Sequence, residues 1–546
     1  MDARSPARPR WSRPRIGSVT LSIAVALYVL AATNLSFWEK AWFYLEGQPL
    51  ALALLATGIV TAFVAMFVTV SVKYLIKPLF IVLVLASAAG AWFTDRFGVI
   101  IDPEMIRNAA ETTSAEAGHL ITPGFLWHMA IFGLLPSALI ASVRIVHRSF
   151  PQKVKWNLAV ILPCLAVFAI AGLSQASTFA SVSREHRDWF ATLNPVVPIS
   201  SVIRYLGYRE AERHLVVKEL GTDAHLTSPV ASSRKPRVTI IVAGETARAE
   251  NFSLGGYGRL TNPELAGKDI VYFPNTTSCG TATAVSIPCM FSVYPRASYS
   301  HRKGLETETL LDVLSHAGVH AEWWDNNTGS KGVADRVTYV SMPDLNDPRF
   351  CRDNECEDGI LLDRLDGWLD GIKQDSVLVL HQMGSHGPAY YLRYPEAYRR
   401  FTPECRSAEF SKCSREEIVN AYDNTILYTD HVLATIIEKL QAREDHLSPS
   451  MIYMSDHGES LGEFGLYLHG APYMIAPSQQ THVPFLLWLG KDMQASVDVS
   501  CLAAKSGADY SHDNLFHTVL GMADVETTVR DTRLDVLSSC RRNVSS

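Results

Sequence analysis

The densest group of candidate nucleophiles lies between residues 275 and 291, in the stretch NTTSCGTATAVSIPCMF. Cys279 and Cys289 lie near its two ends. A threonine hydroxyl at its free pKa is a poor nucleophile, so it needs an adjacent base or a metal ion. The residue types alone do not choose among the hydroxyls, which are those of Thr276, Thr277, Ser278, Thr281, Thr283 and Ser286.

Metal-ligand side chains end two apolar runs elsewhere in the chain. Glu245 follows VTIIVAG, and Asp456-His457 follow SMIYMS. Two carboxylates, one imidazole and one hydroxyl oxygen would make a four-coordinate site of the kind that suits Zn²⁺. Gly458 favours a turn in which Asp456 and His457 converge. Each segment taken singly is more often structural, so the prediction depends on the three places meeting in space.

The elements that must position these residues follow from the pattern after residue 236. Short β-rich runs alternate there with amphipathic helices, which predicts an α/β domain with a mainly parallel sheet flanked by helices. The expected strands are 238–244, 320–325, 376–382, 450–455 and 483–489, and the expected helices are 305–317, 359–373 and 416–441.

Polar residues follow four of these strands. Ligands of open α/β sheets bind beyond the carboxyl ends of the strands. We therefore expect these endings to share one edge of the sheet. They are Glu245 with Thr246, Asn326 and Asn327 with Lys331 shortly after, Ser385 with His386, and Asp456 with His457.

The first third of the chain is different in kind, because long apolar runs dominate it. Each is close to the ~20 residues that a membrane-spanning helix needs. We predict a transmembrane domain of five helices within residues 16–176, and the length of the first run argues against a cleavable signal peptide. The five runs are 16–36, 48–71, 78–95, 123–143 and 156–176.

Basic residues flank alternate ends of these runs. The positive-inside rule then places residues 1–15 in the cytoplasm as a basic tail and everything after residue 176 in a bacterial-type periplasm. Residues 177–235 are expected to form interfacial helices and a linker, and residues 236–546 the catalytic domain. The chain would thus be a multi-pass protein of the bacterial inner membrane.

Charge and cysteine spacing are consistent with that location. A formal net charge of −6 argues against a general nucleic-acid binder. Eight of the nine cysteines come after residue 270. Their spacings do not fit zinc-binding patterns, and loop-like surroundings favour disulfides in an oxidising compartment. The expected pairs are Cys279 with Cys289, Cys351 with Cys356, Cys405 with Cys413 and, with less support from spacing, Cys501 with Cys540.

The loop between the third and fourth apolar runs carries polar residues at a spacing of four. Asn108, Thr112 and Glu116 would form one stripe on a helix. From spacing alone, a solvated helix face explains such a stripe.

The order of the polar segments resembles that of a known family. VAGETARAENFSLGGYG, SCGTATAVSIPCMFS, NNTGSKG, HQMGSHGPAYY and SDHGESLGEFGLYLHG occur in this order. They are similar to the phosphoethanolamine transferases of the alkaline-phosphatase/sulfatase superfamily. The nearest likeness is to the lipid A phosphoethanolamine transferases, which include the mobile colistin-resistance enzymes. The resemblance covers nearly the whole chain.

The resemblance implies specific roles for residues of this sequence. The family's nucleophile matches Thr283, and its zinc ligands match Glu245, Thr283, Asp456 and His457. Matching histidines that contact the transferred group or a second metal are His386 and His469. Substrate-contacting positions match Asn327 and Lys331, and also Asn108, Thr112 and Glu116, which makes substrate contact the preferred interpretation of that stripe. Family disulfides match the first three cysteine pairs, whereas the pair of Cys501 and Cys540 is less generally shared.

The implied reaction is a two-step transfer of phosphoethanolamine from phosphatidylethanolamine to a lipid A phosphate, through a covalent intermediate on Thr283. Masking a lipid A phosphate would weaken the binding of cationic peptides such as polymyxin. We expect one zinc site, with a second metal left open, and a monomer.

Other interpretations remain at this point. Thr246 could be a sulfatase-like nucleophile, although a neighbour of a strand-end ligand more often orients it. His482 and His512 lack companion ligands, while Glu459 and Glu463 could support the site or form a turn. The acceptor could be a core heptose or a periplasmic glucan, or the enzyme could be a phosphoglycerol transferase. A sulfatase would need a C/S-x-P-x-R segment at the nucleophile, which is not seen here, and a catalytically dead sensor would lack a nucleophile or ligand, whereas every expected position is filled.

Overall fold

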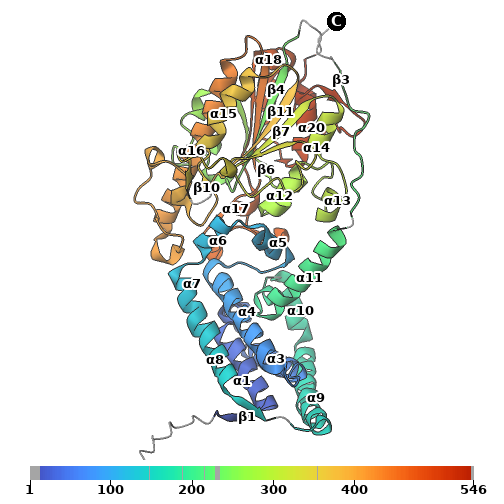
Figure 1. The fold of residues 1–546 in the computed structure, drawn as a ribbon, viewed down its shortest axis with the longest axis vertical. Coiled ribbons are helices and arrows are strands. Elements are labelled where there is room, and N and C mark those ends of the chain that lie inside the picture. The colour runs from blue at the N-terminus through green and yellow to red at the C-terminus, as the bar shows by residue number, and fades with distance from the viewer. Residues whose placement is uncertain are drawn as a thin grey trace, which may run out of the picture. The chain divides into compact units, whose positions relative to one another are not determined.

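The computed structural model describes residues 13–542, apart from 147, 187, 214, 228–233 and 353–354 and the side chains of 115 and 116. Most of the expected basic tail, 1–15, therefore lies outside the described residues. The chain divides into two compact units, which are drawn in Figure 1. One comprises residues 1–102 and 123–203, and the other comprises residues 103–122 and 204–546.

The first unit is helical. Four of its helices are long and apolar enough to cross a membrane, and a fifth span results if a bent pair is counted as one. The chain is thus a multi-pass membrane protein. The spans are α3 (Pro49–Thr69), α4 (Ile76–Phe97), α7, η1 and α8 together (Pro123–His128, Met129–Leu134 and Leu135–Ser142), and α9 (Phe150–Ser174).

The first expected span, 16–36, is not one straight helix. α1 (Ser18–Ala32) ends before α2 (Leu35–Tyr44), and the two axes are bent by 67°. Side-chain hydrogen bonds at the break explain the bend. Asn34 Nδ2 donates to the carbonyl of Val29 at 2.9 Å and to that of Asn194 at 3.0 Å, while Thr33 Oγ1 donates to Val29 at 2.8 Å. Local polar side chains that bind backbone groups compete with continuation of a helix.

Two further helices follow the spans, in the region where the sequence predicts interfacial helices. They are α10 (Ala176–Glu185) and α11 (Val196–Glu212). At the other end of the spans, β1 (Arg15–Gly17) pairs in parallel with β2 (Arg144–Val146), which joins the segment before α1 to the segment after α8.

The second unit is built on a seven-stranded sheet in the order β5-β15-β12-β4-β11-β7-β8. All neighbouring pairs are parallel except those that β15 makes with β12 and β5. The strands are β4 (Arg237–Gly244), β5 (Ile270–Phe273), β7 (His320–Asp325), β8 (Thr338–Ser341), β11 (Ser376–His381), β12 (Ser448–Ser455) and β15 (Phe485–Leu489). The predicted helical membrane domain and mainly parallel α/β domain are confirmed.

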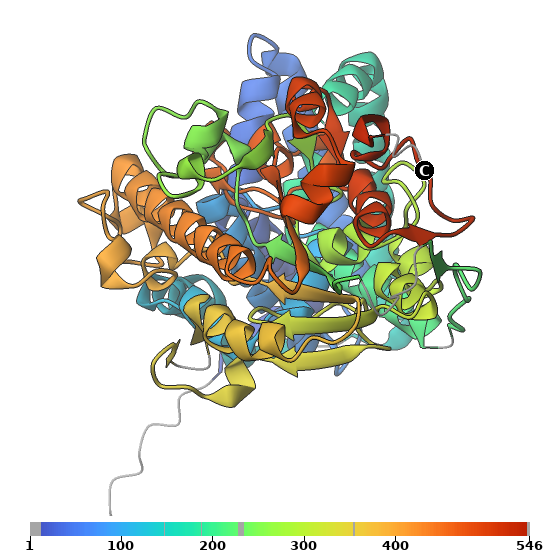
Figure 2. The ribbon, with the colours of Figure 1, turned by 90° about the horizontal axis from the view of Figure 1, so that it is seen from above.

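Helices cover both faces of this sheet. Apolar side chains of α12 (Thr283–Met290), α14 (Leu310–His316) and α20 (Asp513–Met522) share one core cluster with Ile241, Val379 and Ile452 of the strands. On the other side lie α15 (Gly359–Asp370) and α16 (Arg415–Gln441), and Figure 2 shows α16 across the sheet from α20. The predicted helix 305–317 begins only at Leu310, because Thr309 and Asp312 form a capping box there.

All four expected disulfides are present in the second unit, including the pair that spacing supported least. The bonded pairs are Cys279 with Cys289, Cys351 with Cys356, Cys405 with Cys413, and Cys501 with Cys540. The bond between Cys405 and Cys413 closes the loop that leads into α16, and the Cα atoms of the two residues are 5.6 Å apart. The predicted pairing of Cys413 with Cys405 is thus confirmed together with the other three.

The four disulfides close loops of different lengths. The bond between Cys501 and Cys540 spans 39 residues, whereas the bond between Cys351 and Cys356 spans 5. In the chain-entropy account, a cross-link stabilises more when it closes a longer loop. The Cys501–Cys540 bond is therefore expected to contribute the most stability.

We predict that replacing both Cys501 and Cys540 with serine lowers the free energy of unfolding by about 4 kcal/mol, against about 2 kcal/mol for the Cys351/Cys356 double variant. Guanidinium unfolding of the full chain, produced under oxidising conditions, measures both values. The reverse ranking would contradict the prediction.

Candidate functional site

The register of the sheet brings two candidate ligand segments to one edge. Gly244, the last residue of β4, lies opposite Ser455, the last residue of β12. Glu245 and Asp456 therefore leave neighbouring strands at the same level, and Asp456 N–H donates to the Gly244 carbonyl at 2.9 Å. The expectation that strand endings share one edge is confirmed for these two strands.

The third segment arrives through α12, which begins at Thr283 after an extended Ala282. Thr283 Oγ1 lies 3.1 Å from Glu245 Oε2 and 3.3 Å from His457 Nε2. Its side chain is buried. Of the hydroxyls in the 275–291 stretch, this is the one that the described structure places against both Glu245 and His457. Thr281, two residues earlier, instead donates to the Ala471 carbonyl at 2.7 Å.

Glu245, Asp456 and His457 can supply three ligand atoms that all lie within 4.8 Å of one another. His457 Nδ1 lies 2.9 Å from the Gly458 carbonyl, so we assign the proton to Nδ1. Nε2 is then left unprotonated and faces the two carboxylates, 3.4 Å from Glu245 Oε1 and 3.3 Å from Asp456 Oδ2. A hydrogen bond of this kind fixes both the tautomer and the ring orientation of a metal-binding histidine.

The charge states of Glu245, Asp456 and His457 favour binding of a cation. All three side chains are almost completely buried. Burial raises the pKa of Asp456 well above its usual range, and the carboxylate of Glu245 raises it further. Burial also lowers the pKa of His457 to about 3, so the imidazole is neutral. Asp456 Oδ2 accepts no hydrogen bond from the residues that the structure describes. A buried carboxylate oxygen that accepts no hydrogen bond and lies beside a second carboxylate is suited to bind a divalent ion.

Two neighbours hold Glu245 in place. Asn327 Nδ2 donates to Glu245 Oε2 at 2.7 Å and to the Gln382 carbonyl at 2.8 Å. Thr246 Oγ1 donates to Glu245 Oε1, and Thr246 N–H donates to Asp456 Oδ1 at 3.1 Å. The contacts of Thr246 therefore orient two ligands, which argues against Thr246 as the nucleophile.

His386 and His469 lie beside this group. The ring centroids of His457 and His469 are 4.4 Å apart, and those of His386 and His469 are 5.6 Å apart. His469 Nδ1 is 3.4 Å from Glu459 Oε2. Burial raises the pKa of Glu459. These contacts place Glu459 in support of His469, whereas Glu463 forms an ion pair with Arg248 at 3.0 Å, away from the ligands.

The segment that carries Asn108 and Thr112 belongs to the same unit as the sheet. It does not form one continuous helix. α5 (Pro103–Glu111) ends before Thr112, and α6 (Ser114–Leu120) begins after it. Thr112 Oγ1 donates to the Asn108 carbonyl at 2.8 Å. The expected stripe on a single helix is therefore wrong, because β-branched Thr112 and Thr113 interrupt it. The side chain of Glu116 lies outside the described part.

Two polar contacts that the sequence does not predict tie this segment to the rest of the second unit. Lys331 Nζ lies 3.1 Å from Glu111 Oε2. His119 Nε2 lies 3.0 Å from Glu355 Oε2, and Arg393 binds the same oxygen at 2.8 Å. Arg393 Nε also donates to the His386 carbonyl at 2.9 Å. These pairs join residues far apart in sequence, and the position of Glu355 next to a predicted disulfide cysteine is the one signal that could have pointed to them.

The remaining histidine candidates have structural contacts. His512 Nδ1 accepts from Cys279 N–H at 3.0 Å, and its Nε2 lies 2.9 Å from the Ser455 carbonyl. His482 Nε2 bonds the Pro274 carbonyl. Both residues hold loops around the stretch that leads to Thr283.

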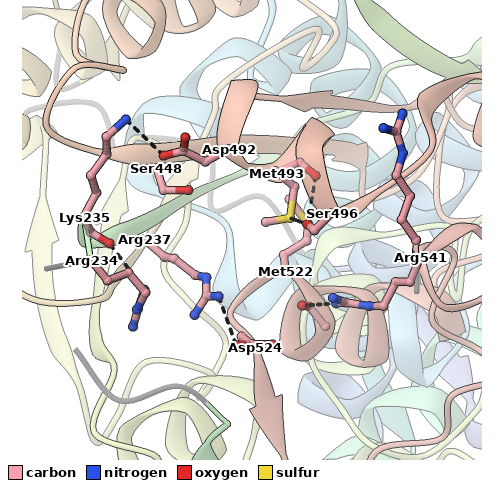
Figure 3. A pocket seen from close by; sticks show the side chains of 12 residues that line it. Arg234, Lys235, Arg237, Ser448, Asp492, Met493, Ser496, Met522, Asp524 and Arg541 are labelled. Atoms are coloured by element: carbon pink, nitrogen blue, oxygen red, sulfur yellow. Dashed lines mark hydrogen bonds and ion pairs between the residues drawn. The ribbon is translucent and has the colours of Figure 1, made fainter. Parts of the chain in front are cut away.

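A cavity of about 370 Å³ lies at the opposite edge of the sheet, where β4 and β12 begin. Figure 3 shows two of its basic side chains, Lys235 and Arg237, turned toward acidic partners. Lys235 pairs with Asp492 at 3.2 Å and Arg237 with Asp524 at 3.0 Å. The candidate site is therefore assigned to the edge that carries Glu245 and Asp456.

Known proteins resemble this chain over nearly its whole length. The Sulfatase family matches residues 237–525, and the family "Phosphoethanolamine transferase EptA/EptB" matches residues 59–209. Phosphoethanolamine transferase EptA of Salmonella typhimurium is 38% identical over 97% of this chain and 98% of its own length. Phosphatidylethanolamine transferase Mcr-1 of Escherichia coli is 36% identical over 94% and 96%. The structure of lipooligosaccharide phosphoethanolamine transferase A from Neisseria meningitidis matches with a TM-score of 0.93 at 36% identity, over 97% of this chain and 100% of that one.

Proposed function

Because this chain belongs to the EptA/EptB phosphoethanolamine transferase family, with a sulfatase-like catalytic domain, we propose that it transfers phosphoethanolamine from phosphatidylethanolamine to a phosphate of lipid A. The single observation that carries the proposal is the position of Thr283 Oγ1 between Glu245 and His457, at 3.1 and 3.3 Å, in a chain related to such enzymes over nearly all of its length.

Glu245, Asp456, His457 and Thr283 Oγ1 would hold one Zn²⁺. When bound, the ion would stabilise the Thr283 alkoxide and offset the charge of the phosphoryl oxygens. The fit rests on two buried carboxylates and a neutral imidazole with its Nε2 facing them. His386 and His469 leave the possibility of a second metal open.

In the first step Thr283 Oγ1 passes its proton to Glu245 Oε2, 3.1 Å away, and attacks the phosphorus of phosphatidylethanolamine, and the bond to diacylglycerol breaks. His386 or His469, whose rings lie beside the ligand group, protonates the leaving alkoxide as a general acid. In the second step an oxygen of a lipid A phosphate attacks the phosphorus of the phosphoethanolamine on Thr283, and the threonine oxygen leaves and takes its proton back from Glu245. Phosphoryl transfer of this kind depends mainly on positioning and charge neutralisation.

Substrate positioning falls to residues around the strand endings. Asn327 holds Glu245, and Lys331 offers a cation beside the 103–122 segment. Asn108, Thr112 and Glu116 of that segment are proposed to contact substrate. Two lipid substrates would account for a catalytic domain that is attached to membrane spans.

The location proposed for the enzyme is the bacterial inner membrane, with the N-terminus in the cytoplasm and residues 236–546 in the periplasm. Four disulfides in the catalytic unit support an oxidising compartment for it. Residues 16–176 would be the membrane domain and 177–235 the interfacial connection, and the enzyme is proposed to act as a monomer.

Mass spectrometry of lipid A tests the proposal. Cells that produce this protein are expected to carry one additional phosphoethanolamine unit on lipid A, and cells that lack it are not. Modification of a core heptose or a periplasmic glucan instead would support the proposed transfer reaction but contradict lipid A as the acceptor. Transfer of phosphoglycerol would contradict the donor.

A further inference from the structure

A second candidate site lies in the membrane unit, at the end of the spans where β1 pairs with β2. A cavity of about 590 Å³ opens there between the segment before α1, the turn before α4 and the segment after α8. Its volume falls in the range of small-ligand pockets, about 300–1,000 Å³. Its lining comprises Arg13, Tyr74, Ile76, Lys77, Val143, Arg144 and Ile145.

The charged side chains that line this cavity are positive. Among the described residues, Arg13, Lys77 and Arg144 line it and no carboxylate does. None of the ion pairs found in the described part of the chain involves these three side chains. The contrast is the cavity in Figure 3, where Asp492 and Asp524 pair with basic partners. Three cations around one cavity repel one another, so binding of an anion in the cavity is electrostatically favourable.

Backbone contacts hold these cations in place. β1 pairs with β2, so that Arg15 lies opposite Arg144, and Arg144 N–H donates to the Pro14 carbonyl at 2.7 Å. Lys77 Nζ donates to the Ala141 carbonyl at 2.8 Å, which uses one of its three donors. Lys77 also belongs to the first turn of α4, where the helix dipole adds positive potential.

The surroundings of the cavity are those of a membrane surface. Tyr74 is 81% exposed and Phe150 80% exposed, and Arg148 lies 4.1 Å from the centroid of the Trp156 ring. Exposed aromatic side chains and cations of this kind lie at the level of lipid headgroups. Residues 13–17, 70–80 and 140–157 contain no aspartate or glutamate. Basic pockets between membrane helices bind phosphate-bearing lipid headgroups.

We propose that this cavity binds the phosphate of an anionic phospholipid headgroup, with Arg13, Lys77 and Arg144 as its ligands and Tyr74 against the glycerol region. The site belongs to the membrane unit alone and does not depend on the transfer reaction proposed above.

Native mass spectrometry of the full chain in a non-ionic detergent tests this site. Phosphatidylglycerol is expected to bind at least 10-fold more tightly than phosphatidylcholine, because only the former brings a net negative charge. Lys77→Gln with Arg144→Gln should weaken phosphatidylglycerol binding by roughly 10- to 30-fold, because each cation near a membrane surface raises the affinity about fivefold. Arg144→Gln alone, at an exposed side chain, should weaken it about 5-fold.

Arg148→Gln with Lys155→Gln is the matched control, because it removes two charges from the segment that follows β2, and neither residue lines the cavity. This variant should retain binding within about twofold. Equal losses in both double variants would show a diffuse surface field and overturn the site. Displacement of phosphatidylglycerol by phosphatidylcholine or by inorganic phosphate at equal concentration would overturn the assignment to an anionic lipid.

Discussion

Replacement of Thr283 with alanine is expected to lower the rate of phosphoethanolamine transfer by roughly 10⁴-fold or more, because loss of an attacking side chain removes the covalent route. The alanine variant keeps Glu245, Asp456 and His457, so it should still bind Zn²⁺, although one ligand oxygen is lost. The transfer rate is measured with purified enzyme and both lipids, and metal content is measured on the same sample.

Thr281→Ala is the matched control for this prediction. Thr281 belongs to the same T-A-T segment, but its hydroxyl donates to the Ala471 carbonyl and does not face the ligand group. Its loss should cost stability more than activity. Mass spectrometry of the wild-type enzyme with donor lipid alone should also find phosphoethanolamine on Thr283. Modification at Thr246 or Ser286 instead would reject Thr283 as the nucleophile.

The sequence predicts the sheet well where the strands are central. The strands that contain Ile241, Val379 and Ile452 are mainly apolar and almost completely buried, because helices cover both of their faces. The pattern does not reveal β5 and β8, since each is a four-residue edge strand with partly exposed side chains. The antiparallel direction of β15 is set by the chain segment that leads into it, and the hydrophobic periodicity of the strand itself does not indicate this direction.

The candidate site divides in the same way. Glu245 and Asp456 follow central strands, so the rule that ligands collect at carboxyl ends of strands brings them together. The choice of Thr283 among its neighbouring hydroxyls comes from the family resemblance, and the structure supports it through the start of α12. The contacts of Glu111 with Lys331 and of Glu355 with Arg393 join distant segments, and no local pattern encodes such pairs.

The disulfides show where local spacing is enough. Cys405 and Cys413 are only eight residues apart in a loop, so few other partners can reach either of them, and the bond forms as predicted. Cys501 and Cys540 lie 39 residues apart, and their meeting depends on how α19 (Val499–Lys505) packs against the end of the chain's described part. Spacing in the sequence therefore predicts the short-range disulfides directly, whereas the long-range disulfide can be predicted only from the fold.

The second large effect is expected from Asp456→Asn, which keeps the shape of the side chain and removes its charge. Asp456 Oδ2 is buried, faces His457 Nε2 at 3.3 Å and has no hydrogen-bond partner among the described residues. The variant should bind Zn²⁺ at least 10²-fold more weakly and should lose transfer by roughly 10³-fold, because two buried carboxylates are what attract the ion. Isothermal titration with Zn²⁺ and the transfer assay measure the two losses.

The same substitution should have the opposite effect on the metal-free protein. The folded-state pKa of Asp456 is raised by burial and by Glu245, so between the unfolded and folded pKa values the folded state binds more protons. The contribution of Asp456 to the stability of the metal-free wild type is then greatest below the unfolded pKa of about 4, and it is lost as the pH rises through the folded pKa. Asp456→Asn removes this part of the pH dependence, and it should make the metal-free protein more stable than wild type at neutral pH.

Asp430→Asn separates metal binding from buried charge in general. Burial raises the pKa of Asp430 to about 7, and its oxygens accept from the backbone N–H groups of Glu264 and Leu265, away from the ligand group. Its substitution should alter the pH dependence of unfolding and leave zinc affinity unchanged. Thermal unfolding between about pH 4 and pH 8, with and without Zn²⁺, distinguishes the two variants. If zinc stabilised Asp456→Asn as strongly as it stabilises wild type and Asp430→Asn, Asp456 would not be a ligand, and the charge argument for the site would fail with it.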